Sequence, residues 1–505
     1  MSAEHFNVAA YLLAGKADSD LVLLTLQGSH TYGELRIASS AIATYLIERG
    51  AKKGDRVLLA GENSLFWVAG YLGILRAGLV CVPVPSNTAP QTLQFFVEHT
   101  GARFALAQAS LAQRLGGMFS SECILLDHAL DGDGTLSALP QLLAQDPPPQ
   151  TPAASTHSSH LAALMFTSGS TRRPQAVMIS HENIRANTES IIEYMELTSG
   201  DRIMVVLPFH YCFGTSLLHT HLRVGGTLVV DPRFMYPEKV LQRMQETECT
   251  GFAGVPSHYQ ILLDKTSLHK KTFPHLRYIQ QAGGHLDSAA IQRLRGALPT
   301  TQVFVMYGQT EATARLSYLP PGLLDTKLGS IGKGIPGVRL TVENNGNLVK
   351  PGEIGEIVAV GENVAQGYWC DPDETERTFR SGRLHTGDMA TVDEEGFITV
   401  VSRDRDFLKC CGTRIGCRQL ELQILECCEL AEVAVVGVPD DVMGEAIKAF
   451  VVPRHRGSTT PEEVKHLCKT HMPLQLVPRE VVVVDALPKN DSGKILKVKL
   501  RSGEE

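Results

Sequence analysis

Short apolar runs alternate with helix-like segments along most of this chain, and this alternation restricts the fold more than any other feature. Residues 55–60 and 79–84 are two such runs, and the segment between them starts at Ser64, a good helix N-cap, and stops near Gly78. Strand, helix and strand in this order form the building block of parallel sheets. Similar runs recur at residues 161–166, 202–207, 227–230, 276–282 and 302–306. The sequence therefore predicts an α/β fold.

The pattern changes after about residue 403. A helix-like segment at 419–429 is followed by strand-like segments at 432–438, 446–452 and 479–484, which is typical of a small α+β domain. A chain of 505 residues is also long for a single core. We therefore expect a large N-terminal domain with mostly parallel sheets (residues 1–403) and a small α+β C-terminal domain (residues 404–505).

Composition and charge exclude several classes of function. The formal net charge is -7 and no basic block occurs, which argues against a nucleic-acid partner. The most apolar stretch, residues 65–85, is broken by Arg76 and by glycines, so we expect no membrane span. The first residues lack the apolar core of a secretory leader, and the eleven cysteines show no zinc-ligand spacing. We expect a cytoplasmic protein with reduced thiols whose partners are small molecules or another protein.

A loop rich in hydroxyls and glycine follows the predicted strand at 161–166. It consists of Thr167, Ser168, Gly169, Ser170 and Thr171. Such a loop can surround phosphate oxygens with backbone N–H groups and hydroxyls, although most Ser/Thr/Gly clusters are simple turns. Four further segments follow this loop along the chain, in this order: YGQTE (307–311), HTGD (385–388), SRDRDFLKCCGTRIG (402–416) and LPKNDSGK (487–494).

Together these five ordered segments resemble the motifs of the acyl-adenylate-forming superfamily, which includes acyl-CoA synthetases, peptide-synthetase adenylation domains and firefly-type luciferases. The resemblance covers nearly the whole chain. It implies that a carboxylic acid reacts with ATP to give an acyl-adenylate and pyrophosphate. The acyl group then passes to coenzyme A or, as a second choice, to the phosphopantetheine arm of a carrier protein. It also implies that the C-terminal domain is a mobile lid.

The resemblance assigns catalytic roles to three residues. Lys494 matches the lysine that reaches into the site from the lid, where a cation neutralises the carboxylate and the α-phosphate. Glu311 matches a glutamate that binds Mg²⁺, and one carboxylate plus phosphate oxygens is a normal way to hold this hard cation. Thr310 is expected to donate its hydroxyl to a phosphate.

The nucleotide is expected to contact several further segments. Tyr307 would stack on the adenine beside Gly308, and Asp388 would accept hydrogen bonds from the ribose hydroxyls. Arg403 would contact the same ribose or a phosphate. The backbone of Gly283, Gly284 and His285 would line the adenine and acyl pockets.

The resemblance also implies two positions of the lid, one for adenylation and one for thioester formation. Arg405 lies where relatives have their swivel residue. Lys409 and Gly412 would belong to the lid face that meets the active site in the second position.

The phosphate loop departs from the family pattern Thr-Gly-x-Pro-Lys-Gly, because Thr171 is followed by Arg172, Arg173, Pro174, Gln175 and Ala176. If the loop needs positive φ at the two glycine positions, arginine and alanine are strained there by about 1 kcal/mol each. Gln175 also removes a cation. Either an arginine of the loop supplies the missing charge, or turnover is slow or lost. We expect an active enzyme; the alternative is a catalytically impaired protein that binds nucleotide or acyl-AMP.

The segment LPFHYCFG (207–214) provides the expected substrate pocket, with His210, Tyr211 and Phe213. Tyr211 stands where acyl-CoA synthetases more often have histidine. Amino-acid-activating relatives place an aspartate in this segment, and none occurs here. The apolar and aromatic character favours an acid without an α-amine, such as a fatty or other aliphatic acid, while an aryl acid stays open. No feature of the sequence separates a ligase from a luciferase-like oxygenase.

Overall fold

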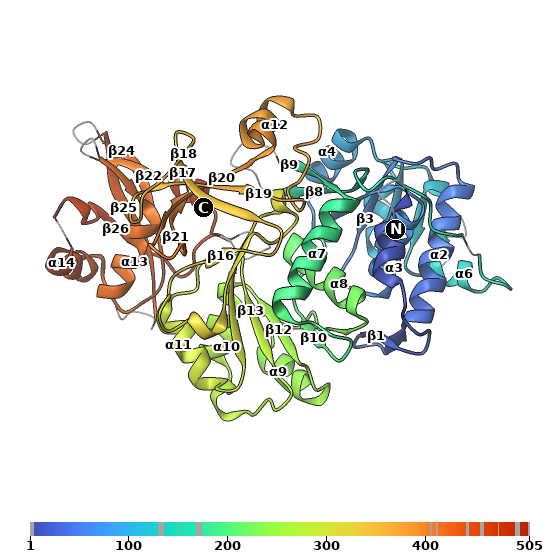
Figure 1. Ribbon diagram of the computed structural model, residues 1–505, viewed down its shortest axis with the longest axis horizontal. Helices are drawn as coiled ribbons and strands as arrows, with labels where there is room; N and C mark the ends of the chain where they lie inside the picture. The colour runs from blue at the N-terminus through green and yellow to red at the C-terminus, as the bar shows by residue number, and fades with distance from the viewer. Residues whose placement is uncertain are drawn as a thin grey trace. The chain divides into compact units, whose positions relative to one another are not determined.

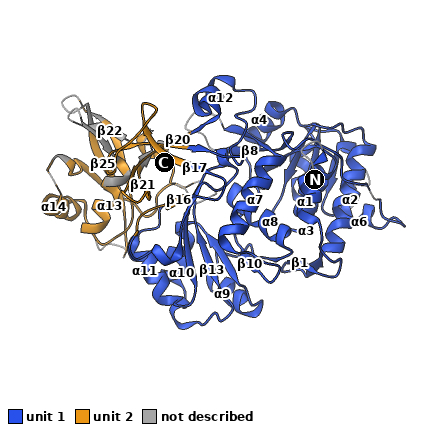
Figure 2. Cartoon of the chain, viewed as in Figure 1, with its two compact units in different colours: residues 1–326, 334–339, 359–384 blue, residues 327–333, 340–358, 385–505 orange. Residues whose placement is uncertain are grey.

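The structure is a computed structural model that describes residues 5–129, 136–149, 151–167, 174–403, 407–410, 413–440, 444–454, 459–472, 474–489 and 495–502. The chain forms two compact units (Figure 2). Unit 1 comprises Met1–Thr326, Gly334–Arg339 and Ala359–Leu384, and unit 2 comprises Lys327–Lys333, Leu340–Val358 and His385–Glu505. The predicted α/β class is confirmed (Figure 1).

Unit 1 contains a seven-stranded sheet in the order β7-β6-β5-β3-β4-β8-β9. All its neighbouring strands are parallel except β8 and β9, which are antiparallel. The strands are β3 (Arg56–Ala60), β4 (Val80–Val84), β5 (Phe104–Ala107), β6 (Ile124–Leu126), β7 (Ser137–Ala138), β8 (Leu161–Thr167) and β9 (Gln175–Ser180). The strands predicted at 55–60, 79–84 and 161–166 are therefore confirmed to within one residue at each end.

A second sheet of nine strands has the order β16-β15-β14-β13-β12-β10-β11-β1-β2. Its central strands, from β14 to β1, are parallel, while β15 and β2 run antiparallel to β14 and β1. The strands are β1 (Leu21–Leu24), β2 (Ser29–Thr31), β10 (Arg202–Val205), β11 (Thr227–Val230), β12 (Gly251–Gly254), β13 (Tyr278–Gln281), β14 (Gln302–Tyr307), β15 (Ser317–Leu319) and β16 (Lys333–Gly334).

The helices of unit 1 cover these sheets, and their starts follow the local sequence. Thr31 accepts a hydrogen bond from the N–H of Glu34, whose carboxylate accepts one in return from the N–H of Thr31, so α2 starts with a capping box. Ser64 caps α3 by accepting from the N–H of Trp67. The helices are α1 (Val8–Leu13), α2 (Tyr32–Glu48), α3 (Leu65–Arg76), α4 (Pro90–Thr100), α5 (Ala112–Leu115), α6 (Leu139–Leu143), α7 (His181–Met195), α8 (Cys212–Val224), α9 (Pro237–Glu246), α10 (Pro256–Lys265), α11 (Ser288–Ala297) and α12 (Pro372–Thr378).

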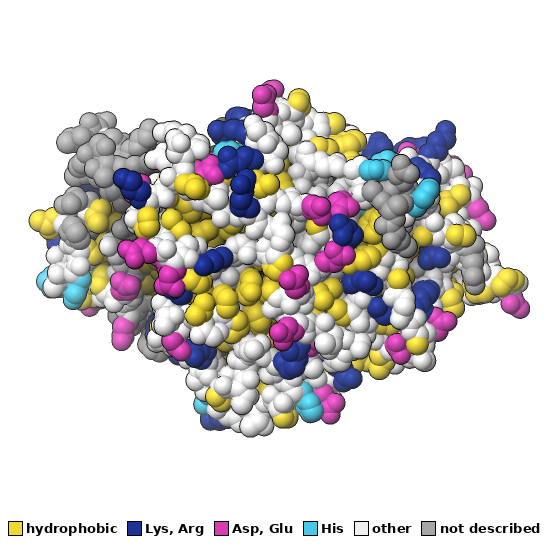
Figure 3. Space-filling model, viewed as in Figure 1, with side chains coloured by type: hydrophobic (Ala, Val, Ile, Leu, Met, Phe, Trp, Pro, Cys, Tyr) yellow, Lys and Arg dark blue, Asp and Glu magenta, His cyan; other side chains and the backbone are white. Residues whose placement is uncertain are grey.

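Short 3₁₀ helices connect several of these elements. They are η2 (Ala109–Leu111), η3 (Ser121–Cys123), η4 (Leu268–Lys270), η5 (Thr310–Ala312), η6 (Pro321–Leu323), η7 (Arg380–Gly382) and, in unit 2, η9 (Leu474–Leu476). Among the residues that the structure describes, no helix is both long enough and apolar enough to cross a bilayer. On the face drawn in Figure 3, basic and acidic side chains are interspersed.

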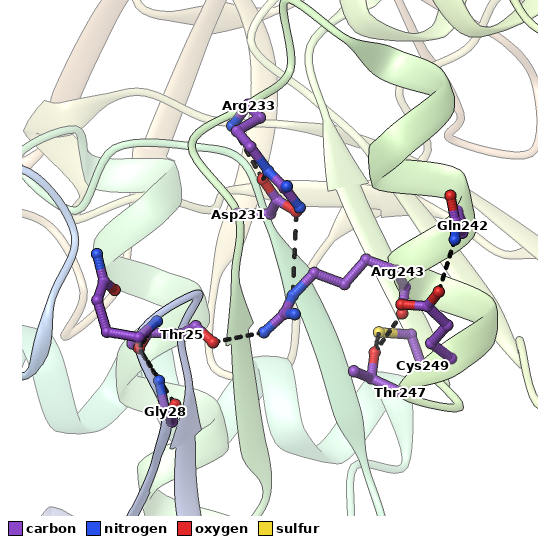
Figure 4. Close-up of polar contacts among 10 residues, drawn as sticks. Thr25, Gly28, Asp231, Arg233, Gln242, Arg243, Thr247 and Cys249 are labelled. Atoms are coloured by element: carbon purple, nitrogen blue, oxygen red, sulfur yellow. Dashed lines mark hydrogen bonds and ion pairs between the residues drawn. The ribbon is translucent and has the colours of Figure 1, made fainter.

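A buried carboxylate anchors one end of the nine-stranded sheet (Figure 4). Asp231 follows β11 and is fully buried, and Arg233 donates to both of its oxygens at 2.9 and 2.7 Å. Arg243 of α9 lies 3.9 Å from the same carboxylate and donates to the carbonyl of Thr25 at 2.7 Å. Burial alone would raise the pKa of Asp231, but the two arginines hold it below its usual value. The cluster therefore joins α9 to Thr25, which directly follows β1 in the turn between β1 and β2.

Unit 2 contains two further sheets. The first has the order β18-β17-β19-β20-β21, and its strands are β17 (Arg339–Asn344), β18 (Asn347–Leu348), β19 (Gly355–Val360), β20 (Leu384–Val392) and β21 (Ile398–Arg403). The second has the order β23-β22-β25-β24, with β26 beside β25. Its strands are β22 (Phe407–Cys410), β23 (Thr413–Gly416), β24 (Leu430–Asp440), β25 (Gly444–Pro453) and β26 (Glu480–Val483).

Three helices, α13 (Cys417–Cys427), α14 (Pro461–His471) and α15 (Lys497–Ser502), complete unit 2. The predicted order of helix and strands after residue 419 is confirmed. The grouping into compact units places residues 385–403 with the C-terminal part of the chain. The boundary predicted at 403/404 is the place where a lid is expected to rotate, and this rotation stays a prediction.

Candidate active site

Four parallel strands bring three of the predicted site segments to one edge of the nine-stranded sheet. β10, β12, β13 and β14 are neighbours and run in the same direction. The segments that follow their carboxyl ends therefore meet, and this edge is where open α/β sheets bind ligands. The predicted residues among these segments are His210, Tyr211, Phe213, Gly283, Gly284, His285, Tyr307, Gly308, Thr310 and Glu311.

The turn after β13 lies against the segment after β10. Gly283 has a φ of +80°, and a Cβ added there would lie 3.3 Å from the hydroxyl of Tyr211 and 3.0 Å from Val255. Gln281 fixes the turn by donating to the carbonyl of Gly284 at 2.6 Å. Gly284 and His285 are exposed. Two segments that are far apart in the sequence are thus brought together.

The turn after β14 is built around Gly308. A Cβ on this residue would lie 1.9 Å from the carbonyl oxygen of Ala314, which is an impossible distance. The carbonyl of Tyr307 accepts a hydrogen bond from the N–H of Leu316 at 2.9 Å and closes the same turn. This close return of the backbone presents η5, which carries Thr310 and Glu311, beyond the end of the sheet.

Thr310 is buried beside the start of α8. Its hydroxyl donates to the sulfur of Cys212 at 3.4 Å. Burial raises the pKa of Cys212 to about 11, so this thiol stays neutral near pH 7. Cys212 could not be selected from its sequence context, because a lone cysteine outside a motif is typical of a packed core residue.

Glu311 has a partner that the sequence reading missed. The hydroxyl of Tyr368 donates to its Oε1 at 2.9 Å, and the N–H of Ala365 donates to its backbone carbonyl at 2.9 Å. Burial, reinforced by the charge of Glu311, raises the pKa of Tyr368, which therefore remains a donor. The two residues are 57 positions apart, so no local motif connects them.

The phosphate loop is described only at its two ends. Thr167 ends β8, while Ser168, Gly169, Ser170 and Thr171 lie outside the described residues, as does Arg172. The side chain of Gln175 donates to Asp371 at 3.4 Å. Ala176 is buried and pairs with Phe166 inside the sheet, and its φ is not positive. The strain considered for Ala176 is therefore absent, because its backbone is extended.

The predicted substrate segment starts α8 on one side of this edge. Phe213 is 3% exposed, and the guanidinium carbon of Arg315 lies 4.5 Å from the centre of its ring. His210 and Tyr211 are half-buried. Arg315 was also not selected from the sequence.

The remaining predicted residues belong to unit 2. Asp388 is buried in β20, directly opposite Arg403 of β21. The turn before it is fixed by Glu356, which accepts from the N–H of Gly387 at 3.0 Å and lies 2.9 Å from Nδ1 of His385. Lys409 lies in β22. Arg405, Gly412 and Lys494 lie outside the described residues.

One other group of possible metal ligands occurs among the described residues. The sulfur atoms of Cys427, Cys428 and Cys468 lie within 4.8 Å of one another. They pack in the hydrophobic core of unit 2, and burial raises the pKa of Cys427 to about 11. Neutral, apolar packing accounts for this cluster.

Comparison with known families gives matches along most of the chain. A family model described as AMP-binding enzyme matches residues 14–369, and one described as AMP-binding enzyme C-terminal domain matches residues 419–494. A feruloyl-CoA synthase from an Amycolatopsis species is 31% identical over 478 residues, which cover 93% of both chains. A long-chain-fatty-acid–CoA ligase of Salmonella typhimurium is 30% identical, over 93% of this chain and 89% of its own.

Solved structures agree with these matches. ATP-bound MatB from Rhodopseudomonas palustris superposes with a TM-score of 0.89 at 28% identity, over 100% of this chain and 99% of its own. The o-succinylbenzoate CoA synthetase (MenE) of Bacillus subtilis in complex with the acyl-adenylate OSB-AMP gives a TM-score of 0.86 at 25% identity, over 98% and 97% of the two chains.

Proposed function

The chain belongs to the AMP-binding enzyme family and is an acid–thiol ligase, and from this premise we propose which reaction its residues carry out. The protein activates an aliphatic carboxylic acid with ATP, releases pyrophosphate, and transfers the acyl group from acyl-AMP to coenzyme A. The observation that carries the proposal is the shared strand edge, which gathers Tyr211, Gly283, Tyr307 and the η5 segment.

The reaction has two steps, adenylation and thioester formation. A carboxylate oxygen of the acid attacks the α-phosphorus of ATP, and the bond from that phosphorus to the β-phosphate oxygen breaks, so that pyrophosphate leaves. The sulfur of the thiolate then attacks the acyl carbon, and AMP leaves. Negative charge gathers at the α-phosphate in the first step, so donors there stabilise the transition state. We assign this role to Lys494 and Thr310, with adenine against Tyr307 and the ribose at Asp388.

The residues at η5 fit a hard divalent cation. Glu311 offers a carboxylate whose Oε1 is oriented by Tyr368, and Mg²⁺ is usually held by one or two carboxylates together with phosphate oxygens. When bound, Mg²⁺ would neutralise phosphate charge. Glu311 would hold it, and Tyr368 would keep that carboxylate in position.

Coenzyme A is the proposed acceptor because the relatives are named as CoA ligases. An acid without an α-amine is proposed because the segment 207–214 has no acidic side chain and buries Phe213. Aliphatic acids are proposed over aryl acids from the same apolar character.

The test is pyrophosphate release from ATP and Mg²⁺ across aliphatic, aryl and α-amino acids, first without any thiol and then with coenzyme A. We expect release with aliphatic acids, no response to α-amino acids, and acid-dependent loss of free thiol once coenzyme A is added. Lys494→Ala should lower the release rate about 100-fold or more, because it removes the cation at the reacting phosphate. The exposed lysine Lys469 provides the control variant Lys469→Ala.

Bound ATP without pyrophosphate release for any acid would contradict the proposal. That result would support the nucleotide-binding alternative raised by the altered phosphate loop. A preference for an α-amino acid would contradict the proposed substrate class alone.

The contact between Tyr368 and Glu311 leads to a more specific prediction. Tyr368→Phe removes the hydroxyl that orients the carboxylate, and we expect the Mg²⁺ concentration at half-maximal rate to rise about tenfold, since a hydrogen bond to a charged group contributes about 1.5–3 kcal/mol. A Mg²⁺ titration of pyrophosphate release measures this. The control is Tyr45→Phe. In the wild type, the hydroxyl of Tyr45 donates to the carbonyl of Ile124 in β6 at 2.8 Å. An unchanged Mg²⁺ titration for Tyr368→Phe would show that this contact does not position Glu311.

A further inference from the structure

Arg315 is a buried charge with unused donors. It is 1% exposed, and its Nε and Nη2 have no hydrogen-bond partner within the part of the chain that the structure describes. No carboxylate among those residues forms an ion pair with it. Burying a guanidinium without a countercharge is costly, and buried charges in proteins are usually paired, so an anionic ligand is a candidate partner for this group.

Arg315 is held firmly by its backbone. Its carbonyl accepts hydrogen bonds from the side-chain amides of Asn187 at 3.1 Å and Asn363 at 2.8 Å. Its guanidinium lies over the ring of Phe213, a residue of the predicted substrate segment. The charge is therefore fixed beside the place where the acyl part of the substrate is expected.

The charge of Arg315 reaches two further side chains of this layer. Burial raises the pKa of Tyr194 on α7 and of Cys212 on α8, and Arg315 opposes the rise at both. The hydroxyl of Tyr194 donates to the sulfur of Met306 at 3.1 Å, and its ring stacks on Tyr318 at 4.1 Å. Arg315 thus lies between the nine-stranded sheet and helices α7 and α8.

Gln280 adds a second unused donor on the same face of the sheet. It is 1% exposed, and neither its Nε2 nor its Oε1 has a partner among the described residues. Its register partner in the neighbouring parallel strand is Phe304, so the two side chains lie on one face. Phe304 contacts the ring of Tyr194 at 6.1 Å, which identifies this face as the one that α7 covers.

Arg243, whose side chain is 18% exposed, shows how a partly buried structural arginine is paired in this protein. Its Nε also lacks a hydrogen-bond partner among the described residues, but its charge faces Asp231 at 3.9 Å and its Nη2 binds the carbonyl of Thr25 (Figure 4). Within the described part of the chain, Arg315 has neither an acidic neighbour of this kind nor a carbonyl partner for its Nη2. Packing among the described residues gives Arg315 the ring of Phe213 and an interaction with the hydroxyl of Tyr194, and neither group carries a negative charge.

We propose that Arg315, assisted by Gln280, receives a second carboxylate at the far end of the acyl group, so that the preferred substrate is a dicarboxylic acid. This inference rests on the proposed function and narrows its substrate class. A guanidinium and a carboxylate form charge-assisted hydrogen bonds through Nε and Nη2, which are the two donors left unused. The side-chain amide of Gln280 donates to the same group.

The test compares dicarboxylic acids with monocarboxylic acids of equal carbon number, from four to ten carbons, in the pyrophosphate assay. We expect the best diacid to exceed its matched monoacid about 100-fold in kcat/KM. Arg315→Met keeps a similar apolar volume and should lower that ratio about 100-fold, whereas Arg315→Lys keeps the charge and should lower it less. Arg243→Met removes a partly buried arginine that already has a countercharge in Asp231, and it should leave the ratio unchanged.

Equal diacid-to-monoacid ratios in the wild type and in Arg315→Met would overturn the inference, as would a wild-type preference for the monoacid. Calorimetric titration of the diacid without ATP separates this result from failure of the proposed function. Diacid binding that is lost in Arg315→Met would support the inference even if no acid released pyrophosphate. Thermal melting of each variant identifies loss of folding, and Arg315→Met is expected to melt at or above the wild-type temperature because it removes an uncompensated charge.

Discussion

A Gly308→Ala variant should lose about 100-fold or more of the pyrophosphate-release rate. The added Cβ would lie 1.9 Å from the carbonyl oxygen of Ala314 and 2.8 Å from the Cα of Arg315, and both atoms belong to the backbone. No side-chain rotation relieves this contact, so the chain between Tyr307 and Arg315 has to move. Displacing positioning groups by about 1 Å can cost about 100-fold in rate. Overpacking should also lower the free energy of unfolding by about 1–3 kcal/mol.

Pyrophosphate release and urea denaturation measure the two effects. Gly296→Ala is the matched control, because Gly296 lies within α11 and nothing lies within 4 Å of an added Cβ. It should leave the rate unchanged and raise the unfolding free energy by about 0.5–1 kcal/mol, since alanine favours helix over glycine. Wild-type activity in Gly308→Ala would mean that the turn after β14 does not have to be rigid for catalysis.

The second large effect is expected on stability alone. Asp201 is 1% exposed at the start of β10, and its carboxylate accepts from Arg277 at 2.8 and 2.9 Å and from the hydroxyl of Thr250 at 2.8 Å. The N–H of Thr198 also donates to it at 2.8 Å. Asp201→Asn removes the charge and turns an amide N–H toward these donors. We expect the free energy of unfolding to fall by about 3 kcal/mol.

The stability effect of Asp201 should depend on pH in a defined direction. Burial alone would raise the pKa of Asp201, but the hydrogen bonds from Thr198, Arg277 and Thr250 outweigh it and lower the pKa. A lowered folded-state pKa contributes stability that is fully present above the unfolded value of about 3.9 and is lost as pH falls through the folded value. The difference between wild type and Asp201→Asn should therefore be constant near neutral pH and shrink below about pH 4.

The control for this prediction is an exposed ion pair in the same unit. Asp264 and Arg293 lie 2.7 Å apart and are about half exposed, so Asp264→Asn should cost less than about 1 kcal/mol. Urea denaturation at several pH values measures both variants. Equal costs for the two substitutions would show that burial does not strengthen the interactions of Asp201. The pyrophosphate-release rate of folded Asp201→Asn should match the wild type, because Asp201 lies at the opposite end of β10 from the candidate site.

The sequence was sufficient to predict elements whose signals are local. The strand at 161–166 and the start of α3 at Ser64 depend on adjacent residues, and both are confirmed. Gly283 and Tyr307 were assigned from the family resemblance; they lie at the ends of β13 and β14, and their roles in binding stay predictions. The five-stranded sheet from β17 to β21 was not predicted, since several of its strands are short or mix buried and exposed residues.

The two residues that we propose to add to the candidate site depend on contacts between distant segments. Tyr368 and Arg315 carry no motif, and a tyrosine or an arginine in isolation is more often a packing or surface residue. Only the fold brings Tyr368 to Glu311 and places Arg315 over Phe213. Conversely, the strain considered at Ala176 came from a family pattern, and the pairing of Ala176 with Phe166 shows an extended backbone there.

The division of the chain into units has a consequence for how the protein can be cut. The backbone passes from one unit to the other at 326/327, 333/334, 339/340, 358/359 and 384/385. A single proteolytic nick therefore cannot release either unit, and a fragment ending at residue 369 would contain some strands of unit 2 without their neighbours. Unpaired strand edges of this kind promote aggregation. Expression of half-chains should consequently give insoluble material, whereas two fragments produced together should reassemble only if the cut falls outside residues 327–385.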